Sequence, residues 1–250
     1  MKNLRLKMVA LILGHFLFAT DAYADEQGFD YFVDLGMSSK QMSLSISESE
    51  FDAEFMTLDL AFTVAYDKFF ASLAYEPSIK DDVRSDGSGL IFYSREDTTL
   101  TAGMNVWPGV SLFGGYRQGT TSGYYSVSND ESLVESNGVF AGISYNRSFD
   151  DKGSAVVSLA IAQLSGNVSL KEPFVNRGTI PGTPPDQIDG DALGFSLGLR
   201  WVGQLSDVST YNVGLKIHRY EFEDSTNFGG LDLSFNEDFT SLSAGITHYF

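Results

Sequence analysis

The amino-acid sequence predicts an all-β chain that closes into a transmembrane, antiparallel, up-and-down β-barrel of about ten strands. Two observations predict this fold class. Apolar residues alternate with small or polar residues at a period of two along most of the chain, and the connections between the predicted strands alternate between short and long. A third observation supports it, since aromatic residues gather where the predicted strands meet the short connections.

Composition excludes several other classes of protein. The 250 residues include 33 acidic and 16 basic side chains and no cysteine, for a formal net charge of −17. A chain without cysteine has no disulfide framework, no thiolate zinc site and no cysteine nucleophile. The excess of acid argues against a nucleic-acid partner, because phosphate binding needs clustered Lys and Arg. A content of 14% aromatic and 43% hydrophobic residues does not fit a collagen, a coiled coil or a disordered chain.

The first 24 residues predict a cleaved signal peptide. Lys2, Arg5 and Lys7 precede an apolar run at residues 8–19, and Ala22-Tyr23-Ala24 places small residues where a signal peptidase cuts. The apolar run is shorter than the roughly 20 residues of a membrane-spanning helix. We therefore expect cleavage after Ala24, and one barrel domain over residues 25–250.

The strands are predicted from the period of two. The clearest is 56–66, where every even position from Met56 to Tyr66 is apolar, and the same alternation recurs at 192–201 and 209–220. Eight strands remain an alternative if the run at 69–76 and one neighbour are misassigned. The ten predicted strands are residues 31–41, 55–66, 69–76, 98–106, 110–119, 138–148, 154–164, 192–201, 209–220 and 239–250.

The connections then predict how the barrel crosses the membrane. The short ones are 67–68, 107–109, 149–153 and 202–207, and the long ones are 42–54, 77–97, 120–137, 165–191 and 221–238. Outer-membrane barrels have short periplasmic turns and long extracellular loops, and an even strand count returns both termini to the periplasm. The bulky face is expected against lipid and the small, polar face in the lumen. The expected aromatic girdle is Tyr66, Phe69, Trp107, Phe149, Trp201, Tyr211 and Phe250.

The last strand carries a family resemblance. Residues 242–250 place apolar residues at alternate positions and end on the aromatic Phe250. This pattern resembles the C-terminal strand of bacterial outer-membrane β-barrel proteins, although His248 departs from the bulky apolar residue common at that place. The resemblance implies export to the outer membrane of a Gram-negative bacterium, contact with outer-membrane lipid and lipopolysaccharide, and recognition of Phe250 by the barrel assembly machinery.

Charged residues predicted to face the lumen are the candidate site. Opposite charges in a narrow interior should pair, because an unpaired buried charge is costly. The resulting network would either hold the barrel shut or form a small constriction that selects solutes by charge. Arg147 and Arg219 are expected on the outward face near the two rims. The predicted lumen-facing set is Asp34, Asp59, Glu76, Arg117, Arg200, Lys216 and His218.

No catalytic, cofactor or metal site is predicted. Only His218 and His248 remain after cleavage, and neither lies in a catalytic motif. A hydrolase site at the rim, with His218 beside Glu221, Glu223 and Asp224, is one alternative. The acidic residues of the long loops are expected to be solvated, because none of these loops has the EF-hand pattern. Divalent ions that bridge these loops to lipopolysaccharide phosphates are the alternative there. The loop acids are Glu48, Glu50, Asp52, Glu54, Asp81, Asp82, Asp86, Glu96, Asp97, Glu221, Glu223, Asp224, Asp232, Glu237 and Asp238.

The function expected from the sequence is that of an outer-membrane barrel with a structural or narrow passive-pore role, without cofactor and without enzymatic activity. A surface-binding protein or adhesin that uses five long acidic loops, with an unidentified external ligand, is the alternative from another class. The rim hydrolase is the third.

Overall fold

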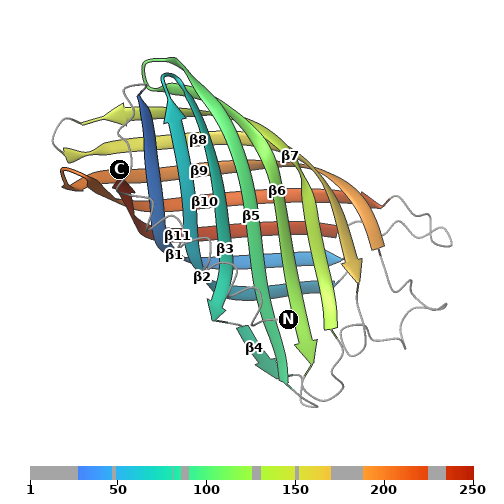
Figure 1. The fold of residues 1–250 in the computed structure, drawn as a ribbon. Coiled ribbons are helices and arrows are strands. Elements are labelled where there is room, and N and C mark those ends of the chain that lie inside the picture. Colours follow the sequence, from blue (N-terminus) through green and yellow to red (C-terminus); the bar gives the residue numbers. More distant parts are fainter. Residues whose placement is uncertain are drawn as a thin grey trace, which may run out of the picture.

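The computed structural model describes residues 28–46, 49–80, 82–85, 90–125, 131–149, 152–169, 188–224 and 235–250 (Figure 1). The predicted signal peptide lies outside these ranges. Within them, no helix has the length and hydropathy to span a membrane. The strands are β1 (Phe29–Ile46), β2 (Ser49–Tyr66), β3 (Phe69–Lys80), β4 (Asp82–Ser85), β5 (Leu90–Trp107), β6 (Val110–Tyr125), β7 (Glu131–Ser148), β8 (Ser154–Ser169), β9 (Ile188–Ser206), β10 (Ser209–Asp224) and β11 (Phe235–Tyr249).

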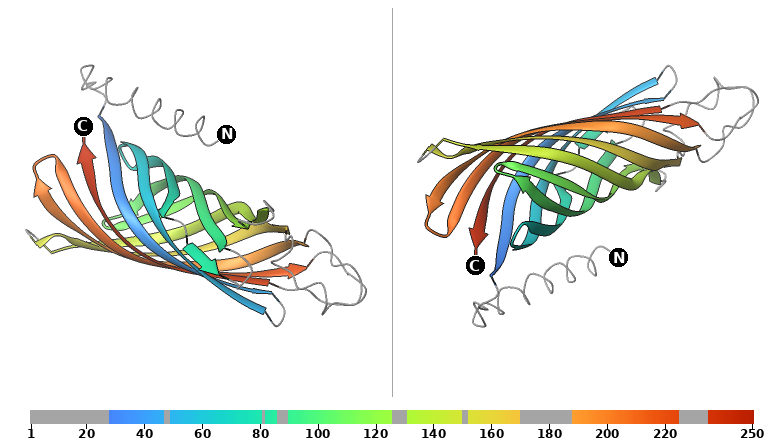
Figure 2. Two further views of the ribbon diagram at one scale, coloured as in Figure 1. Left: turned by 90° about the horizontal axis from the view of Figure 1, so that it is seen from below. Right: turned by 90° about the horizontal axis from the view of Figure 1, so that it is seen from above.

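The strands form one closed antiparallel barrel. Each strand pairs with its neighbour in sequence except that β3 pairs with β5 rather than β4, and β1 pairs with β11 along Phe32↔Tyr249 to Ile46↔Phe235. Since β3 and β4 both pair with β5, the eleven segments fill ten places around the barrel. Figure 2 shows β1 and β11, blue and red, side by side at this closure. The predicted ten-stranded barrel is therefore confirmed.

The short connections all lie at one end, which we call the turn end; the opposite end is the loop end. Asp67 and Gly109 have positive φ angles of 54° and 75°, as tight hairpins between twisted strands require. A Cβ on Gly109 would lie 2.4 Å from the Asn146 carbonyl oxygen, so the position accepts only glycine. The expected turn at 202–207 is shorter than predicted, because β9 continues to Ser206.

The strands are much longer than the sequence indicated. Residues 42–54 were expected to form a long loop, but β1 and β2 pair through this region as far as Ile46↔Ser49. The other expected loops are likewise occupied in large part by strand, since β5 begins at Leu90, β7 at Glu131 and β11 at Phe235. Apolar and polar residues continue to alternate beyond the predicted strand ends. There, however, the apolar residues move from the outer to the inner face of the barrel.

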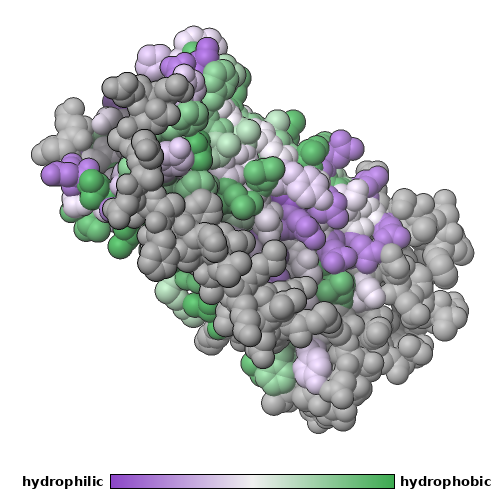
Figure 3. All heavy atoms as spheres, viewed as in Figure 1, coloured by the Kyte–Doolittle hydropathy of each residue, from purple (hydrophilic) through white to green (hydrophobic). Residues whose placement is uncertain are grey.

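This change of face divides the barrel into two halves. On the outside of β8, Val157, Leu159 and Ile161 near the turn end give way to Gln163, Ser165 and Asn167 near the loop end. Inside β1, the order reverses: Gly36, Ser38 and Lys40 are followed by the buried Met42 and Leu44. The turn half is thus apolar outside and polar inside, whereas the loop half is polar outside and apolar inside. In Figure 3 the hydrophobic residues are prominent over the turn half, and a hydrophilic patch lies farther toward the loop end.

An apolar core fills the loop half. Its side chains come from strands on all sides of the barrel, so removing this surface from water stabilises the closed cross-section. The prediction of a small, polar lumen is therefore wrong for the loop half and holds only for the turn half, which we call the lower lumen. The core consists of Met42, Leu44, Ala53, Phe55, Tyr93, Val134, Ala162, Leu164, Ala192, Tyr220, Phe222 and Phe239.

Candidate functional site

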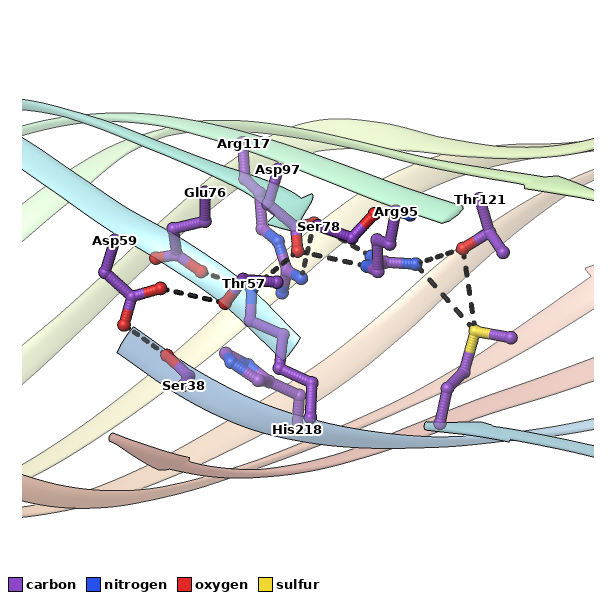
Figure 4. Close-up of polar contacts among 12 residues, drawn as sticks. Ser38, Thr57, Asp59, Glu76, Ser78, Arg95, Asp97, Arg117, Thr121 and His218 are labelled. Carbon is purple, nitrogen blue, oxygen red and sulfur yellow. Dashed lines mark hydrogen bonds and ion pairs between the residues drawn. The ribbon is translucent and has the colours of Figure 1, made fainter. Parts of the chain in front are cut away.

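A layer of charged side chains crosses the barrel where its two halves meet. Five strands, β1, β3, β5, β6 and β11, contribute its members. Figure 4 shows several of them pointing toward one another inside the barrel. We call this set the ion-pair layer; its members are Lys40, Glu76, Arg95, Asp97, Arg117 and Glu237.

Asp97 is the centre of the layer. Arg95 donates from Nε to Asp97 Oδ2 at 3.0 Å and from Nη2 to Oδ1 at 2.9 Å, a two-point contact that holds the carboxylate plane. Lys40 Nζ lies 2.9 Å from Oδ2, and Arg117 Nη2 lies 3.2 Å from Oδ1. Lys40 also pairs with Glu76 on β3. One carboxylate therefore holds three cations from three strands together.

Arg95 connects the layer to the apolar core above it. Its side chain is fully buried, with Nη1 donating to Glu237 Oε1 at 3.1 Å and to Thr121 Oγ1 at 2.7 Å. The guanidinium carbon lies 4.0 Å from the centre of the Phe239 ring, a cation–π contact. A buried arginine is tolerated here because carboxylates, a hydroxyl and an aromatic face replace the lost water.

Tyr220 extends the network to His218 on the same strand. Arg117 Nη1 donates to the Tyr220 hydroxyl at 2.7 Å, and that hydroxyl lies 3.0 Å from His218 Nδ1. Because the hydroxyl accepts from Arg117, its own proton is free to be donated to Nδ1. His218 is buried and stacks on the Tyr220 ring. Its place in the network is that of a hydrogen-bond acceptor.

Charge balances within the layer. Three cations face three carboxylates, and among them the side-chain exposure ranges only up to 28%, at Glu76. Removing so many charges from water costs free energy that the short, multiple contacts offset. One buried atom, Glu237 Oε2, has no hydrogen-bond partner among the described residues.

The lower lumen contains charges that the layer does not use. Asp59 accepts hydrogen bonds from Ser38 and, at 2.9 Å, from Thr57 Oγ1; Asp34 accepts one from Thr247. Arg200 and Lys216 also face inward, since they pair across the strands with Gly214 and Gly198. Both are exposed inside the barrel, and neither has an ion-pair partner among the described residues.

The structure brings together only part of the predicted lumen set. Glu76 and Arg117 belong to the ion-pair layer, and His218 joins it through Tyr220. Asp34, Asp59, Arg200 and Lys216 face the lumen and have no ion pair within the described part of the chain, so the expected general pairing of lumen charges is wrong for them there.

Sequence analysis missed four members of the layer. Lys40 lies an even number of residues after Asp34 in the same predicted strand, so the two share a face. Lys40 could have been assigned to the lumen on that ground. Arg95, Asp97 and Glu237 were assigned to loops, because the change of face hid the strands that carry them.

Two residues of the suggested rim hydrolase, His218 and Glu221, lie on opposite faces of β10. His218 faces inward and pairs with Ser196 and Phe239 across the strands, whereas Glu221 is outward and pairs with Arg219 at 3.3 Å. Nothing is described of the side chains of Glu223 and Asp224. Across the described ranges, no group of three or more His, Cys, Asp or Glu is placed to hold a metal ion.

Most of the acids expected in loops lie on strands instead. Asp52 and Glu54 are on the outside of β2, and Asp238 is on the outside of β11, near Arg219. Arg147 is on the outside of β7 at the turn end, 5.4 Å from the Phe149 ring. Four of the acids that were expected in solvated loops, Glu48, Asp81, Asp86 and Asp232, lie outside the described residues.

Comparison with known proteins gives structural likeness at low sequence identity. No protein-family model matches the sequence, and no curated protein matches it. The translocator domain of the autotransporter NalP from Neisseria meningitidis is 14% identical over 98% of each chain, with a TM-score of 0.49.

Two further solved structures are also similar. OprG from Pseudomonas aeruginosa is 10% identical over 89% of this chain and 96% of that one, with a TM-score of 0.40. The attachment invasion locus protein Ail of Yersinia pestis is 8% identical over 89% and 99%, with a TM-score of 0.40. No residue role is transferred from these proteins to this chain.

Proposed function

We propose that this chain is an outer-membrane β-barrel that is closed to solutes and serves as a structural barrel. The observation that carries the proposal is the double closure of the lumen: the ion-pair layer around Asp97 and, on its loop side, the apolar core around Phe55 and Phe222. Arg95, Phe55 and Phe222 are each at most 1% exposed, and this burial supports a cross-section closed to solutes. A narrow passive pore would need this cross-section to open.

The outside of the turn half supports membrane insertion. Its large apolar residues are exposed, as in Leu35 on β1, Leu159 on β8 and Val213 on β10, and a continuous band of this kind is stable only against lipid. Aromatic residues border it at the turn end, where Phe149 stacks on Trp201 at 5.7 Å and Trp107 is exposed. Short turns at this end favour the periplasmic side.

Conductance in planar bilayers tests closure. We expect purified protein to insert without stable channel steps at low voltage. Insertion is verified by the faster gel migration of the folded barrel before boiling. Regular steps from inserted, folded protein would contradict the closed barrel and favour the passive pore.

Labelling on intact cells tests location and orientation. The chain has no cysteine, so single-cysteine variants have no background. Gln118→Cys is on the outside of β6 in the loop half, and Lys152→Cys is at the turn end. A membrane-impermeant maleimide should label the first and not the second. The opposite pattern would reverse the orientation, and equal labelling would argue against insertion.

A second candidate function is binding of a partner at the cell surface. The observation that favours it is the strand length: the loop half extends beyond the apolar band with a polar exterior that includes Glu54, Glu96 and Glu135. Adhesion to host cells or matrix that is lost when residues 170–187 are deleted, while the barrel still folds, would support this function.

A further inference from the structure

We propose that the lower lumen contains a binding site for a small phosphate-type oxyanion, formed by Arg200 on β9 and Lys216 on β10. The site lies on the turn side of the ion-pair layer and shares no residue with it. It stands whether or not the barrel conducts, because it requires only the lower lumen.

The two cations are neighbours on one wall. Arg200 pairs across the strands with Gly214, two residues before Lys216, so the two side chains are diagonal neighbours on the inner face. Such positions lie roughly 7–8 Å apart at the backbone, within reach of long side chains. Two like charges at this spacing repel each other, and an anion between them would turn that repulsion into attraction.

Among the described residues, the carboxylate whose charge acts most on Lys216 is that of Glu76, which Lys40 already holds in an ion pair. Neither cation takes part in an ion pair among the described residues, although both are exposed in the lumen. The free acids of the lower lumen, Asp34 and Asp59, are on β1 and β2, which lie beyond β11 from β10. Those two carboxylates accept hydrogen bonds from hydroxyl groups instead: Asp59 from Ser38 and Thr57, and Asp34 from Thr247.

The wall beside the cations offers further donors. Each cation is opposite a glycine, Gly214 for Arg200 and Gly198 for Lys216, and each glycine is opposite a serine on the next strand. Hydroxyls border these glycines: Ser158 Oγ would lie 2.4 Å from a Cβ on Gly198, and Ser243 Oγ 2.8 Å from one on Gly214. A guanidinium fork, an ammonium and hydroxyl donors on one wall suit a tetrahedral oxyanion.

Access is from the turn end. Inward residues between the layer and that end, such as Thr99, Ser72 and Ser196, are partly exposed, whereas the loop side is closed at Arg95. The site would therefore take up a phosphate group, free or esterified to a small solute, from the compartment at the turn end.

Calorimetry in a maltoside detergent, which carries no phosphate, tests the site. Inorganic phosphate and glycerol phosphate are titrated separately, to distinguish the free ion from an esterified group. We expect saturable binding of at least one, weakened about tenfold or more in Arg200→Gln and in Lys216→Gln. Arg219→Gln is the matched control, an outward arginine on β10 that should leave binding unchanged.

Each outcome decides between the alternatives. Binding of phosphate assigns the free ion, and binding of glycerol phosphate alone assigns an esterified group. No saturation by either up to about 10 mM, or equal affinity in all three variants, would overturn the site. Gel migration before and after boiling shows that each variant is folded, and conductance tests barrel closure independently of this result.

Discussion

Arg95 holds both carboxylate oxygens of Asp97, which is two residues away on the same strand and faces the same side. In an extended strand, residues i and i+2 share a face, so this pair is fixed locally by β5. The pair becomes the hub of the barrel only because Lys40, Arg117 and Glu237 reach it from three other strands.

Replacing the hub carboxylate should destabilise the barrel strongly. Asp97→Asn leaves three buried cations facing two carboxylates, and breaking a buried network in this way costs about 3–5 kcal/mol. The denaturant midpoint of gel mobility should fall accordingly. Glu221→Gln, whose side chain is 65% exposed, is the control and should change stability by no more than about 0.5 kcal/mol. Equal midpoints for the two variants would show that the layer adds no stability.

The Tyr220 hydroxyl should stabilise the barrel through its two partners. Tyr220→Phe leaves Arg117 Nη1 and His218 Nδ1 without that hydroxyl in a buried place, with an expected loss of about 1–3 kcal/mol. Tyr211→Phe removes a hydroxyl from an exposed tyrosine on the same strand and should have little effect. Thermal unfolding followed by circular dichroism compares the two, and a Tyr220→Phe barrel as stable as Tyr211→Phe would contradict the role of the hydroxyl.

Two adjacent glycines of β6 should differ in their tolerance of a methyl group. A Cβ on Gly115 would meet the Leu100 carbonyl oxygen at 2.0 Å and the Phe140 ring at 2.8 Å, whereas on Gly114 the nearest atom is at 3.1 Å. Overpacking of this kind typically costs about 1–3 kcal/mol, so Gly115→Ala should unfold at lower urea than Gly114→Ala. The reverse order would mean that Phe140 does not lie over Gly115.

The change of face on β8 should mark the edge of the membrane. Ile161 and Gln163 are successive outward positions, the first apolar and the second polar. In reconstituted vesicles, Gln163→Cys should react quickly with a water-soluble maleimide and Ile161→Cys slowly, because thiols react only where water reaches them. Similar rates at both positions would place the boundary elsewhere.

The terminal aromatic should matter for assembly more than for stability. We expect Phe250→Ala to lower the fraction of folded barrel recovered from membranes, because the C-terminal strand resembles an assembly signal. Phe69→Ala, which removes a similarly exposed aromatic residue at the turn end, is the control. An undiminished folded fraction in Phe250→Ala would contradict recognition of this residue.

Alternation along the chain was enough to predict the fold class and most strand positions in the turn half. Period two needs only the geometry of a strand, so the apolar face of 56–66 predicted β2 without knowledge of its partners. The same rule predicted that Glu76 and Arg117 face the lumen, because successive residues of a strand point to opposite faces.

The ends of the strands and the side chains that fill the barrel depend on contacts between strands that are distant in sequence. Polarity changes face between Met37 and Ser39 on β1, because the outside meets water there and the inside becomes a core. Polar residues such as Glu54 and Glu96 indicated a loop when each strand was considered alone. Both lie instead on the outward face of a strand, in the loop half. The pairing of Arg95 with Glu237, 142 residues away, depends on barrel closure, and no local pattern specifies it.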